Sequence, residues 1–224
     1  MAPVTATLFD FDGVLVDSEP VHLAAFNDVL ANEGIAIGES EYAERYLSLD
    51  DAGVFRAVLS REGRTPREEE VRAFVAAKSP RFMARFEESF RVFPGAAELI
   101  ARRAARGPVA IVSGALEREI TFALEKIGVR SSMAFIVSAE CTAASKPDPA
   151  PFLLAMEELR RAGHLGGAVV VEDSTGGVTA AKRAGLRCVA VTHSCSRGEL
   201  LHAGADAVVA DLASVTDALL EAGA

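Results

Sequence analysis

The chain has 224 residues, half of them apolar and a quarter charged, with 32 acidic against 23 basic side chains and a formal net charge of −9. This is typical of a globular protein with one large domain, or with a core domain that carries a smaller inserted one. The acidic balance argues against nucleic acid and membrane partners, because both carry dense negative charge, but a local cationic pocket could still bind a small phosphorylated substrate.

Short apolar, β-branched runs alternate with longer helical patterns through most of the chain. The runs predict strands at Val4–Phe9, Val109–Val112, Ala134–Val137, Ala168–Val171, Cys188–Val191 and Ala207–Val209. Helical spacing occurs between them, in the set Leu116, Ile120, Ala123, Leu124 and Ile127 and in the set Phe152, Ala155, Met156 and Leu159. Nearly continuous apolar strands joined by helices indicate a parallel sheet covered on both faces. We therefore expect a doubly wound α/β core.

The region from residue 18 to residue 90 shows helical patterns and no convincing strand. Its apolar stripes are His22, Ala25, Phe26 and Val29, then Phe55, Val58 and Leu59, and then Val71, Phe74, Val75, Lys78, Phe82 and Phe86. Pro80 is expected to interrupt the third stripe. We therefore predict a helical cap at residues 18–90, inserted into a catalytic core formed by residues 1–17 and 91–224.

The cysteines and the N-terminus favour a cytoplasmic protein. Cys141, Cys188 and Cys195 have no zinc-binding spacing and cannot pair completely, so reduced thiols are expected. The N-terminal apolar stretch lacks a basic flank and is broken by Asp10 and Asp12, which argues against a signal peptide. No apolar run approaches the ~20 residues that span a bilayer.

We expect the protein to be a monomer, with a dimer as the alternative.

Polar residues follow four of the predicted strands or precede the next helix. They are Asp10 and Asp12, Ser113 and Gly114, Lys146, and Glu172 and Asp173. Ligands of open α/β sheets bind beyond the carboxyl ends of the strands, so these residues are expected to converge. Clustered carboxylates attract Mg²⁺, a helix N-terminus with glycine offers N–H groups to a phosphate, and a lysine adds positive charge. Each residue alone could be a helix cap or turn former, but the combination favours phosphate chemistry.

The stretch Asp10–Glu19 resembles the first motif of the haloacid dehalogenase-like superfamily. Ser113, Lys146 and the Glu172-Asp173 pair resemble its second, third and fourth motifs. The resemblance spans the whole chain and points to the helical-cap branch that contains β-phosphoglucomutases and phosphoglycolate phosphatases. It implies a Rossmann-like core, a cap inserted after the first strand, a Mg²⁺ cofactor and an aspartyl-phosphate intermediate.

The resemblance also implies a role for each motif residue. Asp10 would be the nucleophile, and Asp12 the general acid and then the general base. Ser113 and the backbone of Gly114 would bind the transferred phosphoryl group, and Lys146 would neutralise charge. The implied Mg²⁺ ligands are Asp10, the main-chain carbonyl of Asp12, and Asp173, with Glu172 close by or orienting a ligand. True haloacid dehalogenases lack the second aspartate, because halide leaves unprotonated, so Asp12 favours phosphoryl chemistry.

His22 and Lys78 stand where β-phosphoglucomutases carry a His and a Lys that face the substrate. The alternatives are a hydrogen-bonded structural histidine and a lysine that extends along the seam between cap and core. The mutases also have an arginine in the first cap loop that grips a second phosphate, whereas residues 46–53 here lack one and contain Asp50 and Asp51. A phosphatase of a sugar phosphate or phosphoglycolate is therefore favoured over a sugar phosphomutase. A non-catalytic binding module is the remote alternative.

Overall fold

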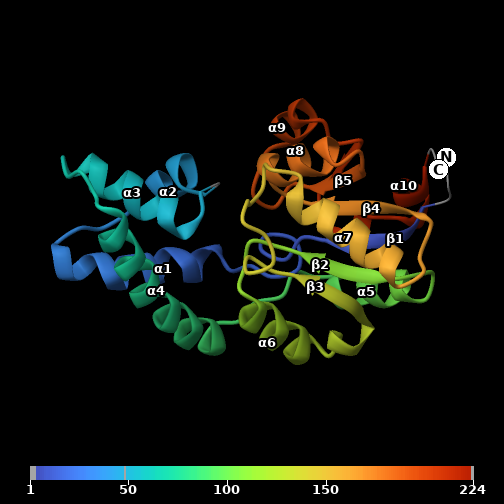
Figure 1. The fold of residues 1–224 in the computed structure, drawn as a ribbon, viewed down its shortest axis with the longest axis horizontal. Coiled ribbons are helices and arrows are strands. Elements are labelled where there is room, and N and C mark those ends of the chain that lie inside the picture. The colour runs from blue at the N-terminus through green and yellow to red at the C-terminus, as the bar shows by residue number, and fades with distance from the viewer. Residues whose placement is uncertain (1–3, 48, 223–224) are drawn as a thin grey trace. The chain divides into compact units, whose positions relative to one another are not determined.

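The structure, a computed structural model, describes residues 4–47 and 49–222. The chain divides into two compact units, which can be traced by colour in Figure 1. An α/β unit is formed by Met1–Asp17 and Val92–Ala224, and a helical unit by Ser18–Arg91. The helical unit is thus an insertion, because the chain on both sides of it belongs to the α/β unit. Each unit has its own hydrophobic core.

Within the described residues, the α/β unit contains a six-stranded sheet in the order β3-β2-β1-β4-β5-β6, with every pair parallel. The strands are β1 (Val4–Phe9), β2 (Val109–Val112), β3 (Met133–Val137), β4 (Gly167–Glu172), β5 (Arg187–Val191) and β6 (Ala207–Val209). Leu8, Ile111 and Val170 are fully buried, as expected for strands that are covered on both faces. β1 lies between β2 and β4, so the loops after these three strands border the crevice where ligands of such sheets bind.

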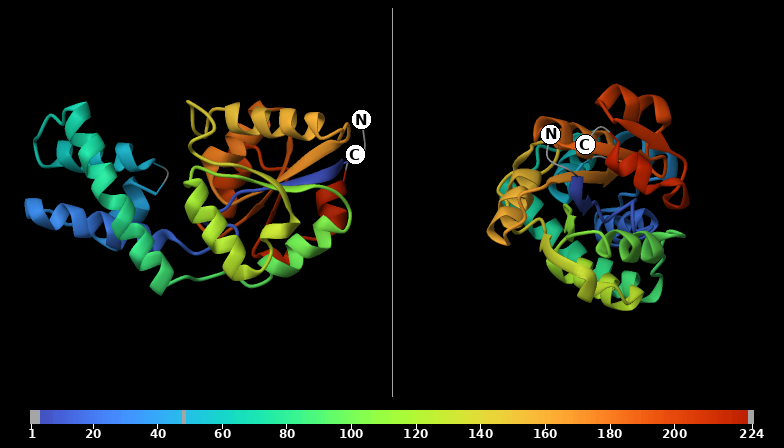
Figure 2. Two further views of the ribbon diagram at one scale, coloured as in Figure 1. Left: turned by 60° about the horizontal axis from the view of Figure 1, so that its bottom comes forward. Right: turned by 90° about the vertical axis from the view of Figure 1, so that its right-hand side faces the viewer.

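Helices cover both faces of the sheet. They are α5 (Ala96–Ala104), α6 (Glu117–Ile127), α7 (Ala150–Arg161), α8 (Thr175–Arg183), α9 (Arg197–Ala203) and α10 (Asp217–Glu221), with short 3₁₀ turns η2 (Arg130–Ser132) and η3 (Leu212–Ser214). Phe152 of α7, Val178 of α8 and Leu200 of α9 share one apolar cluster with the sheet. Figure 2 shows α7 on one side of the sheet and α5 and α6 on the other. The predicted fold class, a Rossmann-like doubly wound core with an inserted α-helical domain, is confirmed.

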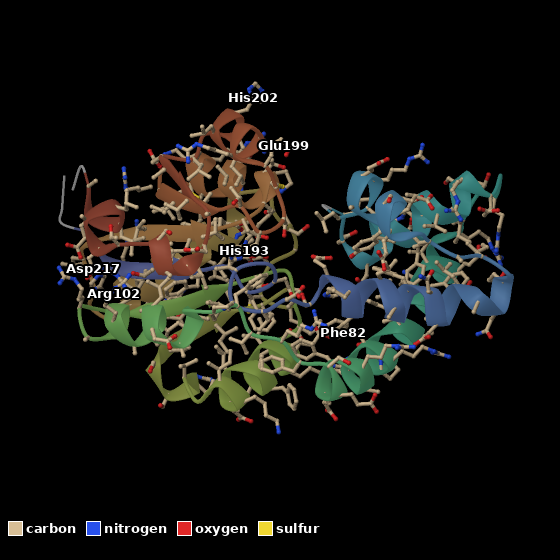
Figure 3. The ribbon with its side chains drawn as sticks, turned by 180° about the vertical axis from the view of Figure 1, so that it is seen from behind. Phe82, Arg102, His193, Glu199, His202 and Asp217 are labelled. Carbon is tan, nitrogen blue, oxygen red and sulfur yellow. The ribbon has the colours of Figure 1, made fainter. Side chains whose placement is uncertain are left out.

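A buried arginine fastens α10 to the rest of the α/β unit. Arg103 of α5 is 1% exposed, and its Nε donates to Thr7 Oγ1 at 2.9 Å. Its Nη1 donates to Asp217 at 2.9 Å and to Glu221 at 2.8 Å. Arg102 adds a second ion pair to Asp217, and both residues are labelled in Figure 3. The guanidinium thus joins β1, α5 and α10.

The helical unit consists of α1 (Glu19–Leu30), η1 (Ala31–Glu33), α2 (Glu39–Arg45), α3 (Asp51–Arg61) and α4 (Glu68–Glu88). Its core includes Phe26 and Phe55, whose rings meet edge to face. The prediction that Pro80 interrupts the third stripe was wrong, because α4 continues through it. Near this proline, which has no N–H to donate, Arg81 Nη1 donates to the carbonyl of Ala77 at 2.6 Å. Among the described residues, no helix combines the length and apolarity that crossing a membrane requires.

Candidate active site

Lys146 occupies the centre of a polar cluster beyond the carboxyl ends of β1, β2 and β4. Its Nζ donates to Asp10 Oδ1 and to Glu172 Oε1, each at 2.6 Å, and to the carbonyl oxygen of Val112 at 2.9 Å. Asp10 directly follows β1, Val112 ends β2 and Glu172 ends β4. One ammonium group, which has three hydrogens to donate, therefore joins three neighbouring strands.

Glu172 is completely buried, and both of its oxygens are engaged. Oε1 accepts from Lys146, while Oε2 accepts from the N–H groups of Asp173 at 2.9 Å and Ser174 at 3.0 Å and from Ser174 Oγ at 3.0 Å. Ser174 Oγ also accepts from the N–H of Gly177 and so caps α8. A Cβ on Gly177 would lie 1.7 Å from Glu172 Oε1, so the first turn of α8 requires glycine there. Glu172 thus holds both the lysine and the start of the helix.

The electrostatics of the cluster are those of two carboxylates that share one ammonium. Burial raises the pKa of Asp10 to about 8, and the charge of Glu172 acts in the same direction, whereas Lys146 opposes both. Burial acts to lower the pKa of Lys146, but the charges of Asp10 and Glu172 outweigh it and raise that pKa. An additional cation would favour the ionised form of Asp10.

The same residues fit a hard divalent cation. Asp10, Glu172 and Asp173 each place a carboxylate oxygen within 4.8 Å of the others. With one ammonium among them, these three carboxylates carry excess negative charge, and carboxylate oxygens are ligands that Mg²⁺ prefers. A Cβ on Gly13 would lie 1.9 Å from Asp173 Oδ2, so glycine gives this carboxylate room. Because both oxygens of Glu172 are engaged, Asp10 and Asp173 are the better placed ligands.

Asp12 lies on the turn that follows β1. Gly13 has φ +76°, a conformation that glycine adopts without strain. The N–H of Gly13 donates to the carbonyl of Val16 at 2.9 Å, and the backbones of Asp12 and Val16 form an isolated parallel β-bridge. Asp12 is half-buried, and its charge contributes to raising the pKa of Asp10. The turn therefore holds the second aspartate beside the first.

Ser113 and Gly114 follow β2. The N–H of Ser113 donates to the carbonyl of Val137 at 2.9 Å, and Ser113 Oγ accepts from the N–H of Ala115 at 3.0 Å. The second bond uses the hydroxyl as an acceptor, so its hydrogen can be directed to a ligand. Gly114 is exposed, and a Cβ there would meet nothing within 4 Å, so packing does not require this glycine.

Two residues of the loop after β5 were missed by the sequence analysis. His193 Nδ1 lies 2.7 Å from the carbonyl oxygen of Gly13, and Ser194 Oγ donates to Asp173 Oδ2. β5 is parallel to the other strands, so its carboxyl end lies at the same edge of the sheet. Attention to every strand end, including the end of β5 at Val191, would have identified this loop.

In the helical unit, the buried Lys78 lies beside the half-buried His22. Lys78 is 2% exposed, its Nζ donates to Asp51 Oδ1 at 2.6 Å, and it lies 2.7 Å from His22 Nδ1. The ammonium is also 4.5 Å from the ring centroid of Phe26, and the His22 ring stacks on Phe82. The structure therefore brings together the two cap residues predicted to bind substrate and adds Asp51 as the counter-ion of Lys78.

The acidic stretch at residues 46–53 has structural roles inside the same unit. Asp50 is the N-cap of α3 and accepts from the N–H of Gly53 at 2.7 Å. Asp51, the next residue, pairs with Lys78. Ser48 lies outside the described residues. The two aspartates thus stabilise a helix start and a buried cation.

Comparison with known proteins identifies the family. The haloacid dehalogenase-like hydrolase family matches residues 7–191. The chain belongs to this family. A phosphoglycolate phosphatase of Rhodospirillum rubrum is 30% identical to this hydrolase over 218 residues, which cover 95% of this chain and 89% of that protein. A phosphorylated carbohydrates phosphatase of Thermotoga maritima is 30% identical over 207 residues, which cover 91% of this chain and 93% of that protein.

A solved structure shares the fold of this hydrolase over nearly its whole length. The crystal structure of CbbY from Rhodobacter sphaeroides in complex with phosphate matches with a TM-score of 0.83 at 29% identity and covers 97% of this chain and 99% of that chain. The resemblance drawn from the sequence motifs is therefore confirmed. So is the expected enzyme class, a phosphoric monoester hydrolase, which the family and its phosphatase relatives support.

Proposed function

We propose that this hydrolase is a cytoplasmic, Mg²⁺-dependent phosphatase of a small metabolite, of the sugar phosphate or phosphoglycolate type, and that it acts through an aspartyl phosphate on Asp10. The observation that carries the proposal is the contact of Lys146 with Asp10 and Glu172, beside the carboxylate of Asp173. The names of two relatives, a phosphoglycolate phosphatase and a phosphorylated carbohydrates phosphatase, support the substrate class.

In the first step, the carboxylate of Asp10 attacks phosphorus, and the bond between phosphorus and the ester oxygen breaks. Asp12 gives its proton to that oxygen, which leaves as an alcohol. Asp10 attacks only when ionised, and the ammonium of Lys146 favours that form. Ser113 Oγ and the N–H of Gly114 donate to the phosphoryl oxygens. When bound to Asp10, Asp173 and the carbonyl of Asp12, Mg²⁺ supplies positive charge to the transferred group.

In the second step, Asp12 removes a proton from water, and the resulting hydroxide attacks the phosphorus of the aspartyl phosphate. The bond between phosphorus and Asp10 breaks, inorganic phosphate leaves, and Asp12 is again protonated. Glu172 takes no part in proton transfer, since its oxygens hold Lys146 and the start of α8. Its role is to orient the cationic side of the site.

The competing function is that of a sugar phosphomutase, which shares the first step. Such an enzyme must then bind a second phosphate group while the sugar bisphosphate reorients in the site. Residues 46–53 contain no lysine or arginine, and Asp50 and Asp51 serve the helical unit itself. We assign His22 and Lys78 to substrate binding. The corresponding test is that His22→Ala and Lys78→Ala lower activity more than Asp50→Ala does.

The decisive experiment compares Asp10→Asn with Asp206→Asn. The carboxylate of Asp206 accepts from the N–H of Cys188 at 2.8 Å, near the amino end of β5. Asp206→Asn therefore makes the same change from carboxylate to amide, but at the end of the sheet opposite to the proposed active site. Asp10→Asn should fold normally but release no phosphate from phosphoglycolate, sugar phosphates or an aryl phosphate, whereas Asp206→Asn should stay active. Near wild-type turnover by Asp10→Asn would refute the proposed nucleophile. Interconversion of glucose 1-phosphate and glucose 6-phosphate with little free phosphate would establish the mutase instead.

A further inference from the structure

The loop that follows β5 reaches two separate parts of the proposed active site. Its start is anchored to the sheet, because the N–H of Thr192 donates to the carbonyl of Val209 in β6 at 3.1 Å. The next two residues, His193 and Ser194, then contact the turn after β1 and the carboxylate after β4. Consecutive residues of one loop therefore connect the two segments that carry the proposed acid–base and metal-binding groups.

The imidazole of His193 is held in a defined plane and tautomer. Its ring stacks on Phe93, with 3.9 Å between ring centroids and 14° between planes. Phe93 is itself tied to the turn after β1, because its N–H donates to the carbonyl of Leu15 at 3.0 Å. His193 Nδ1 lies 2.7 Å from the carbonyl oxygen of Gly13, and a carbonyl can only accept, so Nδ1 carries the hydrogen. His193, labelled in Figure 3, thus fixes the peptide group between Gly13 and Val14, in the turn that carries Asp12.

Ser194 acts on the other segment. Its hydroxyl donates to Asp173 Oδ2, the oxygen that lies 1.9 Å from where a Cβ on Gly13 would be. That Cβ would also lie 2.8 Å from Ser194 Oγ, so the absence of a side chain at residue 13 allows all three groups to meet. The contact fixes the rotation of a carboxylate that is 2% exposed.

We propose that His193 and Ser194 are positioning residues: His193 aligns the Asp12–Gly13 turn for proton transfer, and Ser194 aligns Asp173 for the divalent cation. This inference rests on the proposed phosphatase function, because it assigns the two residues to the acid–base and metal-binding parts of that reaction. Neither side chain exchanges a proton with substrate in this scheme. Each acts through the group to which it is hydrogen-bonded.

For His193, two substitutions separate the hydrogen bond from the ring stacking. His193→Phe keeps a ring against Phe93 and removes the donor, whereas His193→Asn removes the ring and keeps an N–H that can take the place of Nδ1–H. The assay is kcat/KM for phenyl phosphate, whose leaving oxygen needs a proton, and for 2,4-dinitrophenyl phosphate, whose leaving group departs as a stable anion. A misplaced Asp12 should lower kcat/KM only for phenyl phosphate. His193→Phe should therefore lower kcat/KM about tenfold for phenyl phosphate and less than about twofold for the dinitrophenyl ester. His193→Asn should keep the wild-type ratio of the two substrates.

For Ser194, the readout is Mg²⁺ binding itself, measured calorimetrically on the full chain without substrate. Ser194→Ala should weaken Mg²⁺ binding by about tenfold, as is usual when a group that orients a metal ligand is removed. Ser196→Ala is the matched control, because Ser196 lies two residues further along the same loop and caps α9 through the N–H of Glu199. This control should leave the Mg²⁺ affinity unchanged.

The possible results separate this inference from the function on which it rests. Suppose that the wild type is active. If His193→Phe lowers kcat/KM equally for both esters, or if Ser194→Ala binds Mg²⁺ with wild-type affinity, the corresponding positioning role is overturned and the proposed function is not. The role of His193 is also overturned if His193→Asn changes the ratio of kcat/KM for the two esters while His193→Phe keeps the wild-type ratio. That result would show that the ring acts only by packing against Phe93. A wild type that hydrolyses neither ester overturns the proposed function, and the inference falls with it.

Discussion

Replacing Lys146 with methionine should destabilise the fold strongly, because it removes the ammonium group that pairs with the completely buried carboxylate of Glu172. In the wild type, Lys146 Nζ contacts Asp10 and Glu172 at 2.6 Å, with side-chain exposures of 14%, 11% and 0% for the three residues. Methionine keeps most of the volume of lysine and cannot donate. Glu172 Oε1 would then lose its ammonium partner inside the protein.

The size of the effect follows from the burial of the pair. Breaking a buried ion pair by removing one partner costs about 3–5 kcal/mol, since the remaining charge is left uncompensated. For a domain of this size, that corresponds to a fall in Tm of roughly 10 °C. Lys182 supplies the matched control, because it pairs with Asp206 at 2.7 Å but the two side chains are 35% and 28% exposed. Lys182→Met should cost less than about 1 kcal/mol.

The assay is thermal unfolding followed by circular dichroism at pH 7.5 in EDTA. The chelator is needed because a bound divalent cation would stabilise the native state by mass action and mask part of the loss. The α/β unit and the helical unit are to be fitted separately if two transitions occur. Equal changes in Tm for Lys146→Met and Lys182→Met, or a rise in Tm for Lys146→Met, would refute the reasoning.

Three further expectations follow from the same structure. Gly177→Ala should lower the free energy of unfolding in urea by about 1–3 kcal/mol, because its Cβ would strike Glu172, whereas Gly176→Ala, whose Cβ meets nothing within 4 Å, should not. Phosphate release should stop in EDTA, return with Mg²⁺ and be inhibited by excess Ca²⁺, since the larger ion takes more oxygens at longer distances; full activity after chelation would contradict this. The hydrogen bond from Arg103 lowers the pKa of Glu221 below 4.5, so the stability that Glu221 contributes is fully present above 4.5 and is lost as the pH falls through the lowered pKa. Glu221→Gln should therefore have a lower urea midpoint than wild type at pH 7, and the difference should shrink as the pH is lowered below 4.5.

The sheet could be predicted from the sequence because parallel strands buried on both faces need nearly continuous apolar side chains. Each observed strand begins and ends within one residue of its predicted bounds. The helical patterns were less informative at Pro80, because a proline in a long amphipathic stripe can either end a helix or be accommodated within it. In α4 the buried positions Phe82 and Phe86 lie beyond the proline, and packing of this stripe outweighs the missing hydrogen bond.

The residues of the candidate site could be found because strand ends in a doubly wound sheet converge on one edge. The contacts between them could not, since they depend on loop conformation that has no periodic signature. Nothing in the sequence indicates that the two oxygens of Glu172 accept hydrogen bonds from Lys146 and from the start of α8. Nor does the sequence indicate that Asp51 pairs with Lys78. His193 and Ser194 were missed for a different reason: the end of β5 marks their loop, but single polar residues after a strand are ordinary in loops.

The central position of β1 has a consequence for how the chain assembles during synthesis. Ala6 of β1 pairs with Ala168 of β4, roughly 160 positions later, so at ~5–20 residues per second this pairing must wait on the order of 10–30 s. The whole helical unit, with its own core, is made in that interval and before β2. Both edges of this apolar strand are unpaired until β2 is made, and one edge stays exposed to other chains until β4 is made. Nascent chains that stall before β4 are therefore expected to be the species most prone to aggregate, and the helical unit the first part to resist proteolysis.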